Sequence, residues 1–191
     1  MEPELICLAH PRRGHFELGT GYHGDLWLDL DALFLRPAVL RPHVQRLGDL
    51  LAEHGIDAVC GPMAGGAFLA LAMADLLGTA FLPAYSRPGQ AGSPAGYRLP
   101  GSTRDMIGGW RVAIVDDAVN AATAVQACFR QLRDHGAVPV AVASLLALGP
   151  ADDIVAATME VPFYTVATMR SQAWPTADCP FCACGTPLAP A

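Results

Sequence analysis

The stretch that decides the fold is Val112-Ala113-Ile114-Val115-Asp116-Asp117-Ala118-Val119-Asn120-Ala121-Ala122-Thr123-Ala124-Val125. Four apolar residues end in two adjacent carboxylates, and a turn of small residues then leads into a segment with helical spacing. In an open parallel sheet the ligand crevice lies at the carboxyl ends of the strands, so Asp116 and Asp117 are aimed at that crevice. Small residues let backbone N–H groups approach a phosphate, and the start of a helix adds a favourable dipole. The stretch therefore predicts a phosphate-binding site.

Apolar runs alternate with helix-like segments along the rest of the chain. The expected strands are 56–60, 79–85, 111–116, 138–148 and 163–168, and the expected helices are 37–54, 67–77, 123–135 and 152–159. Continuously apolar strands that alternate with helices predict a parallel sheet covered on both faces. We therefore expect an α/β fold in one domain, 1–191, with a five-stranded parallel sheet flanked by helices.

The stretch 112–125 resembles the 13-residue motif of the type I phosphoribosyltransferases, in which two acidic residues follow a strand and precede a phosphate loop. The resemblance implies that Asp116 and Asp117 bind the ribose hydroxyls of 5-phosphoribosyl-1-pyrophosphate (PRPP), directly or through Mg²⁺. It also implies that the following residues cradle the 5′-phosphate: Ala118, Val119, Asn120, Ala121, Ala122 and Thr123. Asn120 and Ala122 depart from the family, which commonly has Thr and Gly there. An ordinary buried strand with a solvated acidic turn would explain one aspartate but not the whole arrangement.

A second segment, Gly61 to Ala67, joins an expected strand to an expected helix and resembles the pyrophosphate loop of the same family. By that resemblance, backbone N–H groups of four residues face the leaving group: Met63, Ala64, Gly65 and Gly66. A glycine-rich turn alone more often marks a simple loop than a site. Its position before the Asp-Asp motif strengthens the functional interpretation.

Both ends of the chain are similar to orotate phosphoribosyltransferases, in the segments Gly14 to Asp29 and Cys179 to Leu188. The resemblance implies a small hood, built from about 1–36 and 170–191, and a homodimer. Phe16, His23 and Trp27 are then the candidate contacts to a base, and a purely structural role is the alternative for each.

Residues 86–105 are rich in Gly and Pro and lack an apolar period, which predicts a mobile loop. Orotate enzymes carry lysines and a histidine in such a loop, where cations neutralise the departing pyrophosphate. This chain has no lysine, so Arg87 and Arg98 are the candidates, and ordinary solvated arginines are the alternative. Leu148-Gly149-Pro150 also stands where an arginine for the orotate carboxylate is expected.

The resemblance implies a pentosyltransferase that moves phosphoribosyl from PRPP to a nitrogenous base and releases pyrophosphate. Orotate is the first candidate, which would place the enzyme in pyrimidine nucleotide synthesis. A non-catalytic PRPP-binding sensor and a transferase for a different base are the alternatives. Arginine cannot give up a proton as a perturbed lysine can, and this favours the sensor.

Charge and cysteine usage limit the other classes. The net charge of −6 and the absence of an arginine stripe argue against nucleic acid, and no apolar run has membrane-spanning length. The acidic start lacks a secretory signal, so we expect a cytoplasmic protein. Cys179, Cys182 and Cys184 could hold one Zn²⁺ with a fourth ligand from elsewhere. A reduced, packed tail and a surface disulfide are the alternatives.

Overall fold

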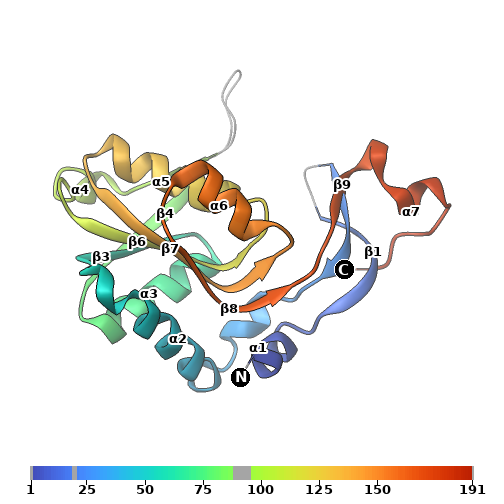
Figure 1. Ribbon diagram of the computed structural model, residues 1–191, viewed down its shortest axis with the longest axis horizontal. Helices are drawn as coiled ribbons and strands as arrows, with labels where there is room; N and C mark the ends of the chain where they lie inside the picture. The colour runs from blue at the N-terminus through green and yellow to red at the C-terminus, as the bar shows by residue number, and fades with distance from the viewer. Residues whose placement is uncertain (1, 19–20, 88–95, 191) are drawn as a thin grey trace.

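The main body of the protein is a six-stranded sheet with helices on both faces (Figure 1). It is taken from a computed structural model, which describes residues 2–18, 21–87 and 96–190. The strands are β3 (Ala58–Pro62), β4 (Ala80–Arg87), β5 (Gly96–Arg98), β6 (Arg111–Val119), β7 (Val138–Leu148) and β8 (Phe163–Met169), and their order is β5-β4-β3-β6-β7-β8. The five predicted parallel strands are present, and β5 adds an antiparallel edge strand beside β4.

The predicted loop 86–105 is wrong on both of its flanks. Ser86 and Arg87 end β4, residues 96–98 form β5, and α4 (Gly101–Arg104) follows. The polar, glycine-rich sequence of this region gave no strand signal, because β5 pairs with β4 at the sheet edge and needs no apolar face of its own. The rest of the predicted loop, 88–95, lies outside the described residues.

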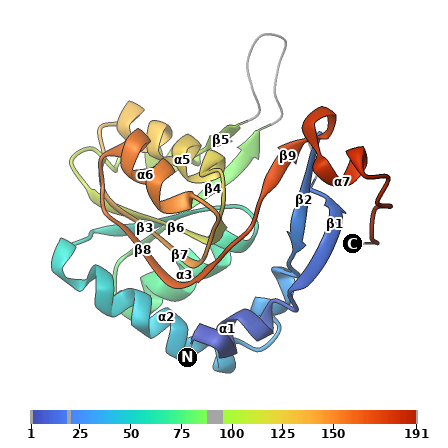
Figure 2. The same ribbon diagram turned by 45° about the vertical axis from the view of Figure 1, so that its right-hand side comes forward.

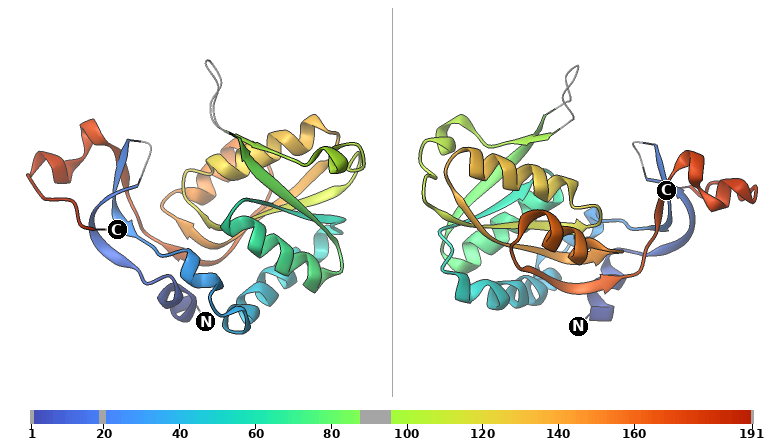
Figure 3. Two further views of the ribbon diagram at one scale, coloured as in Figure 1. Left: turned by 180° about the vertical axis from the view of Figure 1, so that it is seen from behind. Right: turned by 45° about the horizontal axis from the view of Figure 1, so that its top comes forward.

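Two layers of helices bury the two faces of the sheet (Figure 3). Helices α2 (Pro37–Leu51) and α3 (Gly65–Leu77) cover one face, where residues such as Leu47 and Met73 are fully buried. Helices α5 (Thr123–Asp134) and α6 (Ala151–Met159) cover the other face through residues such as Leu132. Each such side chain contributes about 1.5–3 kcal/mol by leaving water. None of the described helices has both the length and the apolar character needed to cross a membrane.

The hood is a separate three-stranded antiparallel sheet that stands beside the main body (Figure 2). Its strands are β1 (Arg12–Glu17), β2 (Tyr22–Trp27) and β9 (Ala173–Pro175), in the order β1-β2-β9, followed by turn η3 (Thr176–Asp178) and helix α7 (Pro180–Ala183). Both ends of the chain build it, as predicted.

The predicted hood boundary at about residue 36 extends too far into the main body. Helix α1 (Glu2–Leu8) and the turn η1 (Asp31–Phe34) instead place Leu5 and Leu33 in the core under α2 and α3. These two apolar side chains are fully buried, so the segments before and after the hairpin anchor it to the sheet.

The strand order shows where a ligand site is expected in the main sheet. β3 lies between β4 and β6, so the chain leaves β3 toward one edge of the sheet and builds β6, β7 and β8 toward the other. Helix α3 follows β3 and helix α5 follows β6, on opposite faces. The loops that leave β3 and β6 therefore diverge at a topological switch point, where open α/β sheets bind their ligands.

Candidate active site

The two acidic residues lie at the switch point. Asp116 and Asp117 stand near the carboxyl end of β6, where Asp116 pairs with Ser144 of β7. The Asp117 N–H donates to Asp116 Oδ1 at 3.0 Å, and the Ala118 N–H donates to Asp117 Oδ1 at 2.8 Å. These bonds fix both carboxylates close to the backbone of their own strand.

Burial dominates the electrostatics of this pair. Asp116 is 9% exposed, and burial, followed by the charge of Asp117, raises its pKa well above the ordinary range. Burial also raises the pKa of Asp117, although hydrogen bonds oppose that shift. Two adjacent buried carboxylates favour any cation that enters between them.

The pyrophosphate-type loop, Gly61 to Ala67, packs closely against Asp116 and Asp117. A Cβ atom on Gly65 would stand 1.7 Å from Asp117 Oδ2, and one on Gly66 would stand 2.6 Å from Asp116 Oδ1. A Cβ on Gly61 would stand 2.1 Å from the Gly66 carbonyl oxygen. These three glycines are therefore required by close approach, and Met63 and Ala64 complete the loop above them.

The phosphate-type loop leads directly into helix α5. Ala122 occupies the N-cap position in the left-handed region with φ of 55°, and Thr123 is the first helical residue. This φ explains why glycine is common at the equivalent place in the family, since only glycine adopts it without cost. No side chain caps this described helix start, so its N–H groups are open to a ligand.

A cleft of about 1250 Å³ lies between this loop and the hood. On the main-body side it is lined by Asp116 and by the whole phosphate-type loop: Ala118, Val119, Asn120, Ala121, Ala122 and Thr123. Across the cleft stand Tyr22 and Asp25 of β2 and Trp174 of β9. Asp116 and the phosphate-type loop thus face a cavity large enough for a nucleotide-sized ligand, whereas Asp117 is not among its described lining residues.

Tyr97 and Arg170 are two further candidates that the sequence did not reveal. The Tyr97 hydroxyl donates to the Met63 carbonyl oxygen at 3.4 Å. Its pKa is raised, first by burial and then by the charge of Asp116. Arg170 follows β8 and is the one guanidinium among the described residues that line the cleft.

The two loop arginines lie on the β4–β5 ribbon. Arg87 pairs with Gly96 and Arg98 with Tyr85, and both arginine side chains are exposed. Neither belongs to the described lining of the cleft. Arg104, a third arginine of this region, instead donates to the Leu99 carbonyl oxygen at 2.9 Å.

The three predicted base contacts lie elsewhere in the hood. Phe16 is 2% exposed and packs against Trp27 at a ring separation of 6.1 Å. His23 is buried among His15 and two cysteines, and Trp27 lines a smaller hollow near α1. None of the three is among the described cleft residues, because the strand faces that carry them turn toward the hood interior or away from the cleft.

The predicted cysteine ligands separate into two groups. Cys179 and Cys182 lie beside His15 and His23, with all four ligand atoms within 4.8 Å of one another. Cys184 is exposed and lies outside this group. The spacing of the tail could not show this, because the two histidines come from the other end of the chain.

No protein-family model matches the chain. Orotate phosphoribosyltransferase of Thermus thermophilus is 28% identical over 175 residues, which cover 92% of this chain and 90% of that protein. The crystal structure of orotate phosphoribosyltransferase from Aeropyrum pernix is 26% identical, has a TM-score of 0.65 and covers 88% of this chain and 94% of its own. In sequence and in fold the chain is similar to the type I phosphoribosyltransferases, the family that the motif at Asp116 and Asp117 resembles.

Adenine phosphoribosyltransferase from Thermoanaerobacter pseudethanolicus shares the fold, with a TM-score of 0.71 at 16% identity over 88% of this chain and 100% of its own. The type I phosphoribosyltransferase motif at Asp116 and Asp117 therefore lies in the expected fold. The predicted enzyme class, a pentosyltransferase, is confirmed by the orotate relatives.

Proposed function

We propose that this phosphoribosyltransferase transfers phosphoribosyl from PRPP to orotate and releases pyrophosphate. One observation carries the proposal: at the switch point of the sheet, the loop after β3 packs against Asp116 and Asp117, and the loop after β6 follows directly from them. One loop offers backbone N–H groups for the leaving pyrophosphate, and the other offers the start of α5 for the 5′-phosphate. The carboxylates between them would hold the ribose hydroxyls.

Mg²⁺ fits this site, because two buried carboxylates with raised pKa values need positive charge and carboxylate oxygens are its preferred ligands. Asp116 and Asp117 would hold it together with oxygens of the substrate. When bound, it would neutralise charge on the pyrophosphate and ribose oxygens.

The protein's own contribution is positioning and charge stabilisation. As the base nitrogen bonds to ribose C1, the bond from C1 to the pyrophosphate oxygen breaks and negative charge grows on the leaving group. The loop glycines admit that group closely, and Arg87 and Arg98 would approach it from the β4–β5 ribbon. The Tyr97 hydroxyl would hold the pyrophosphate loop in place through the Met63 carbonyl.

The base would lie between the hood and the end of β8. Tyr22 and Trp174 offer aromatic surface there, and Arg170 offers a guanidinium that can bind a carboxylate through two hydrogen bonds. Orotate carries such a carboxylate and adenine does not. Arg170 would therefore replace the arginine that the sequence lacks after the fourth parallel strand.

The first test is calorimetric titration of PRPP with and without Mg²⁺, followed by pyrophosphate release with orotate in the same samples. We expect wild-type binding that needs Mg²⁺, its loss in Asp116→Asn/Asp117→Asn, and no change in Asp134→Asn, an exposed aspartate at the end of α5. Failure of the wild type to bind PRPP would overturn the proposal. Binding without release for any base would support the sensor alternative, which the missing lysines favour.

The second test addresses the base. Arg170→Gln should raise the KM for orotate about tenfold or more, as expected for the loss of a hydrogen bond to a charged group. The Kd for PRPP should stay the same. Turnover with adenine or another base but not with orotate would assign a different acceptor.

A further inference from the structure

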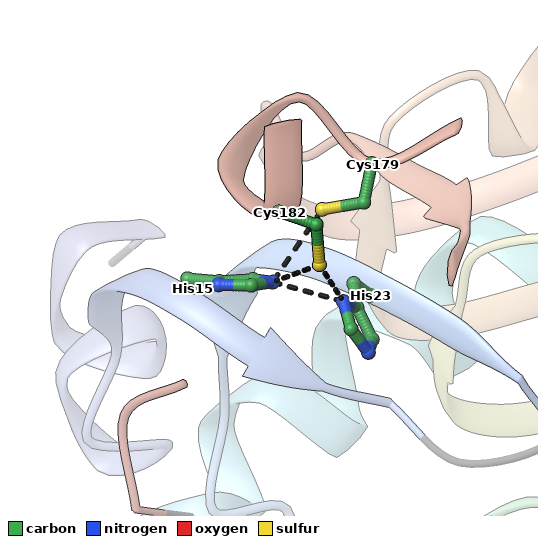
Figure 4. A group of neighbouring side chains, drawn as sticks. All are labelled: His15, His23, Cys179 and Cys182. Atoms are coloured by element: carbon green, nitrogen blue, oxygen red, sulfur yellow. Dashed lines mark hydrogen bonds between the residues drawn. The ribbon is translucent and has the colours of Figure 1, made fainter. Parts of the chain in front are cut away.

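The hood contains a group of four side chains that the transferase reaction does not use. His15 lies on β1, His23 on β2, Cys179 just before α7 and Cys182 within it (Figure 4). Their side chains point toward one another, and their four ligand atoms lie within 4.8 Å of one another. His15, His23 and Cys179 are almost fully buried, whereas Cys182 stands at the surface.

The three nitrogen-to-sulfur distances in this group match those around a single metal ion, whereas the two ring nitrogens lie closer together than two ligands of one zinc ion do. His15 Nε2 lies 2.9 Å from His23 Nδ1, 3.4 Å from Cys179 Sγ and 3.7 Å from Cys182 Sγ. Cys182 Sγ lies 3.3 Å from His23 Nδ1. In a tetrahedral zinc site, bonds of about 2.0–2.1 Å to nitrogen and 2.3 Å to sulfur place ligand atoms about 3.3–3.8 Å apart.

The protonation of His15 prepares it as a ligand. His15 Nδ1 lies 2.8 Å from the Thr186 carbonyl oxygen, which can only accept, so Nδ1 carries the proton. Nε2 then has a free lone pair directed at the group. Metal-bound histidines typically donate their second nitrogen to a carbonyl or carboxylate in this way.

Ordinary hydrogen bonding does not satisfy this arrangement. Three donor or acceptor atoms surround His15 Nε2, which has one lone pair in the plane of its ring. One metal ion would accept lone pairs from all four atoms at once. Two thiolates and two imidazoles form a ligand set that prefers Zn²⁺ to Mg²⁺ or Ca²⁺.

We propose that His15, His23, Cys179 and Cys182 bind one structural Zn²⁺ that fastens the C-terminal segment to the β1–β2 hairpin. The four protein ligands fill a tetrahedral shell and leave no position for substrate. The site is independent of the Mg²⁺ proposed for the transferase reaction. It corrects the ligand set expected from the sequence, because the two histidines take the place of Cys184.

The zinc site also supports the wall of the cleft. Phe181 stacks on His15 at a ring separation of 5.3 Å and an angle of 25°, and Trp174 meets Phe181 edge-on at 5.7 Å. Trp174 lines the cleft. Removal of the metal should therefore loosen Trp174 while leaving the loops around Asp116 intact.

The test begins with the metal content of the full-length protein after dialysis in metal-free buffer. We expect about one zinc per chain in the wild type and in Cys184→Ser, which is the matched control because Cys184 lies outside the group. Cys182→Ser should bind zinc at least about 10-fold more weakly. Cys182 is exposed, so this substitution leaves the buried part of the hood unchanged.

Cobalt provides a second, spectroscopic measurement on the wild type. Co²⁺ added to the metal-free protein should give the visible bands of tetrahedral cobalt and a thiolate-to-metal band in the near ultraviolet. Absence of zinc together with absence of these bands would overturn the proposal. Equal metal loss in Cys184→Ser and Cys182→Ser would also overturn it, as would a Cys179–Cys182 disulfide seen as a loss of two hydrogens in the intact mass.

Metal removal also separates this inference from the proposed function. Chelation should lower the melting temperature and raise the KM for the base, and Zn²⁺ should restore both. The Kd for PRPP should not change. A chelated protein with unaltered stability would contradict a structural role for the metal, whatever the outcome of the transferase assays.

Discussion

The acidic site and the group of four side chains in the hood (His15, His23, Cys179 and Cys182) are assembled from the chain in different ways. Asp116 and Asp117 are neighbours in sequence, and the glycine loop that touches them follows the strand next to theirs. His15 and Cys179 are 164 residues apart and meet only because β1, β2 and β9 form one sheet. A site whose residues lie in one short segment can be predicted from the sequence. A site whose residues come from both ends of the chain can be recognised only once the fold is known.

The two sites also differ in how they respond to substitution. At the acidic site the neighbouring atoms leave no space beside the loop glycines, so even a methyl group matters. In the hood one ligand stands at the surface, so its replacement changes chemistry and little packing. Experiments that compare packing, charge and backbone strain in the two regions can sharpen or break this contrast.

The largest effect is expected from Gly65→Ala. The new methyl carbon would overlap Asp117 Oδ2 at 1.7 Å, so the loop or the carboxylate has to move by about 1 Å or more. Displacement on that scale costs about 100-fold in activity, and kcat/KM for pyrophosphate release should fall at least that far. Gly101→Ala is the control, because a Cβ there meets nothing within 4 Å. Equal activity in both variants would show that the glycine loop is not held against the acidic pair.

Asp116→Asn should remove binding of PRPP yet stabilise the free protein. The folded state raises the pKa of Asp116, so it binds its proton more tightly than the unfolded chain does. Wild-type stability should therefore fall as pH rises above the ordinary carboxyl range of about 4, through the raised pKa, and the asparagine variant should lack this fall.

Thermal unfolding from pH 4 to pH 8, in buffer without metal or ligand, measures this difference. Each 1 kcal/mol gained should raise the melting temperature by about 2–4 °C. Asp134→Asn should behave as the wild type. An Asp116→Asn variant that is less stable than the wild type at pH 8 would mean that the carboxylate is held by favourable partners.

A smaller effect is expected from Ala122→Gly. Ala122 has a φ of 55°, which costs an alanine about 1 kcal/mol or slightly more relative to glycine. The substitution should therefore stabilise the protein by about 1 kcal/mol in denaturant unfolding. Ala124→Gly, two residues later inside α5, should instead destabilise it by about 0.5–1 kcal/mol. The same sign for both variants would contradict the left-handed conformation of the phosphate loop.

The smallest effect concerns an ion pair between two strands of the hood, β1 and β2. Arg13 Nη1 lies 3.0 Å from Asp25 Oδ2, and the two side chains are 53% and 27% exposed. Such a pair contributes less than about 1 kcal/mol, so Arg13→Gln should barely change the melting temperature. Because Asp25 lines the cleft, the KM for the base should rise by about two- to fivefold, measured against Arg46→Gln on α2. A large loss of stability would show that the hood is held mainly by this ion pair.

The sequence predicted the main sheet well because its strands carry a strong signal. The apolar runs of β3, β6 and β7 are buried on both faces, and Gly55, Gly78 and Gly136 end helical segments just before β3, β4 and β7 begin. Edge strand β5 escaped prediction because Gly96-Tyr97-Arg98 has neither apolar periodicity nor length. Its Tyr97, which reaches the pyrophosphate loop, was missed for the same reason.

The hood was predicted in outline but not in detail. Its segments were identified by resemblance, yet the side of the sheet that faces the cleft depends on how the hood sits against β8. Phe16 and Trp27 pack against each other in the hood, and Tyr22 and Trp174 line the cleft instead. Arg170 was not recognised because nothing in its local sequence shows that the chain crosses the cleft after β8.

The order of strands in the hood sheet has a consequence for folding during translation. The hairpin of β1 and β2 is synthesised before the main sheet, but the third strand of the hood, β9, ends at Pro175, after every strand of the main sheet has been synthesised. A nascent chain that stalls before that point carries a hairpin with an unpaired edge and a cleft without its aromatic wall. The hood sheet can therefore be completed only after the whole main sheet has been translated.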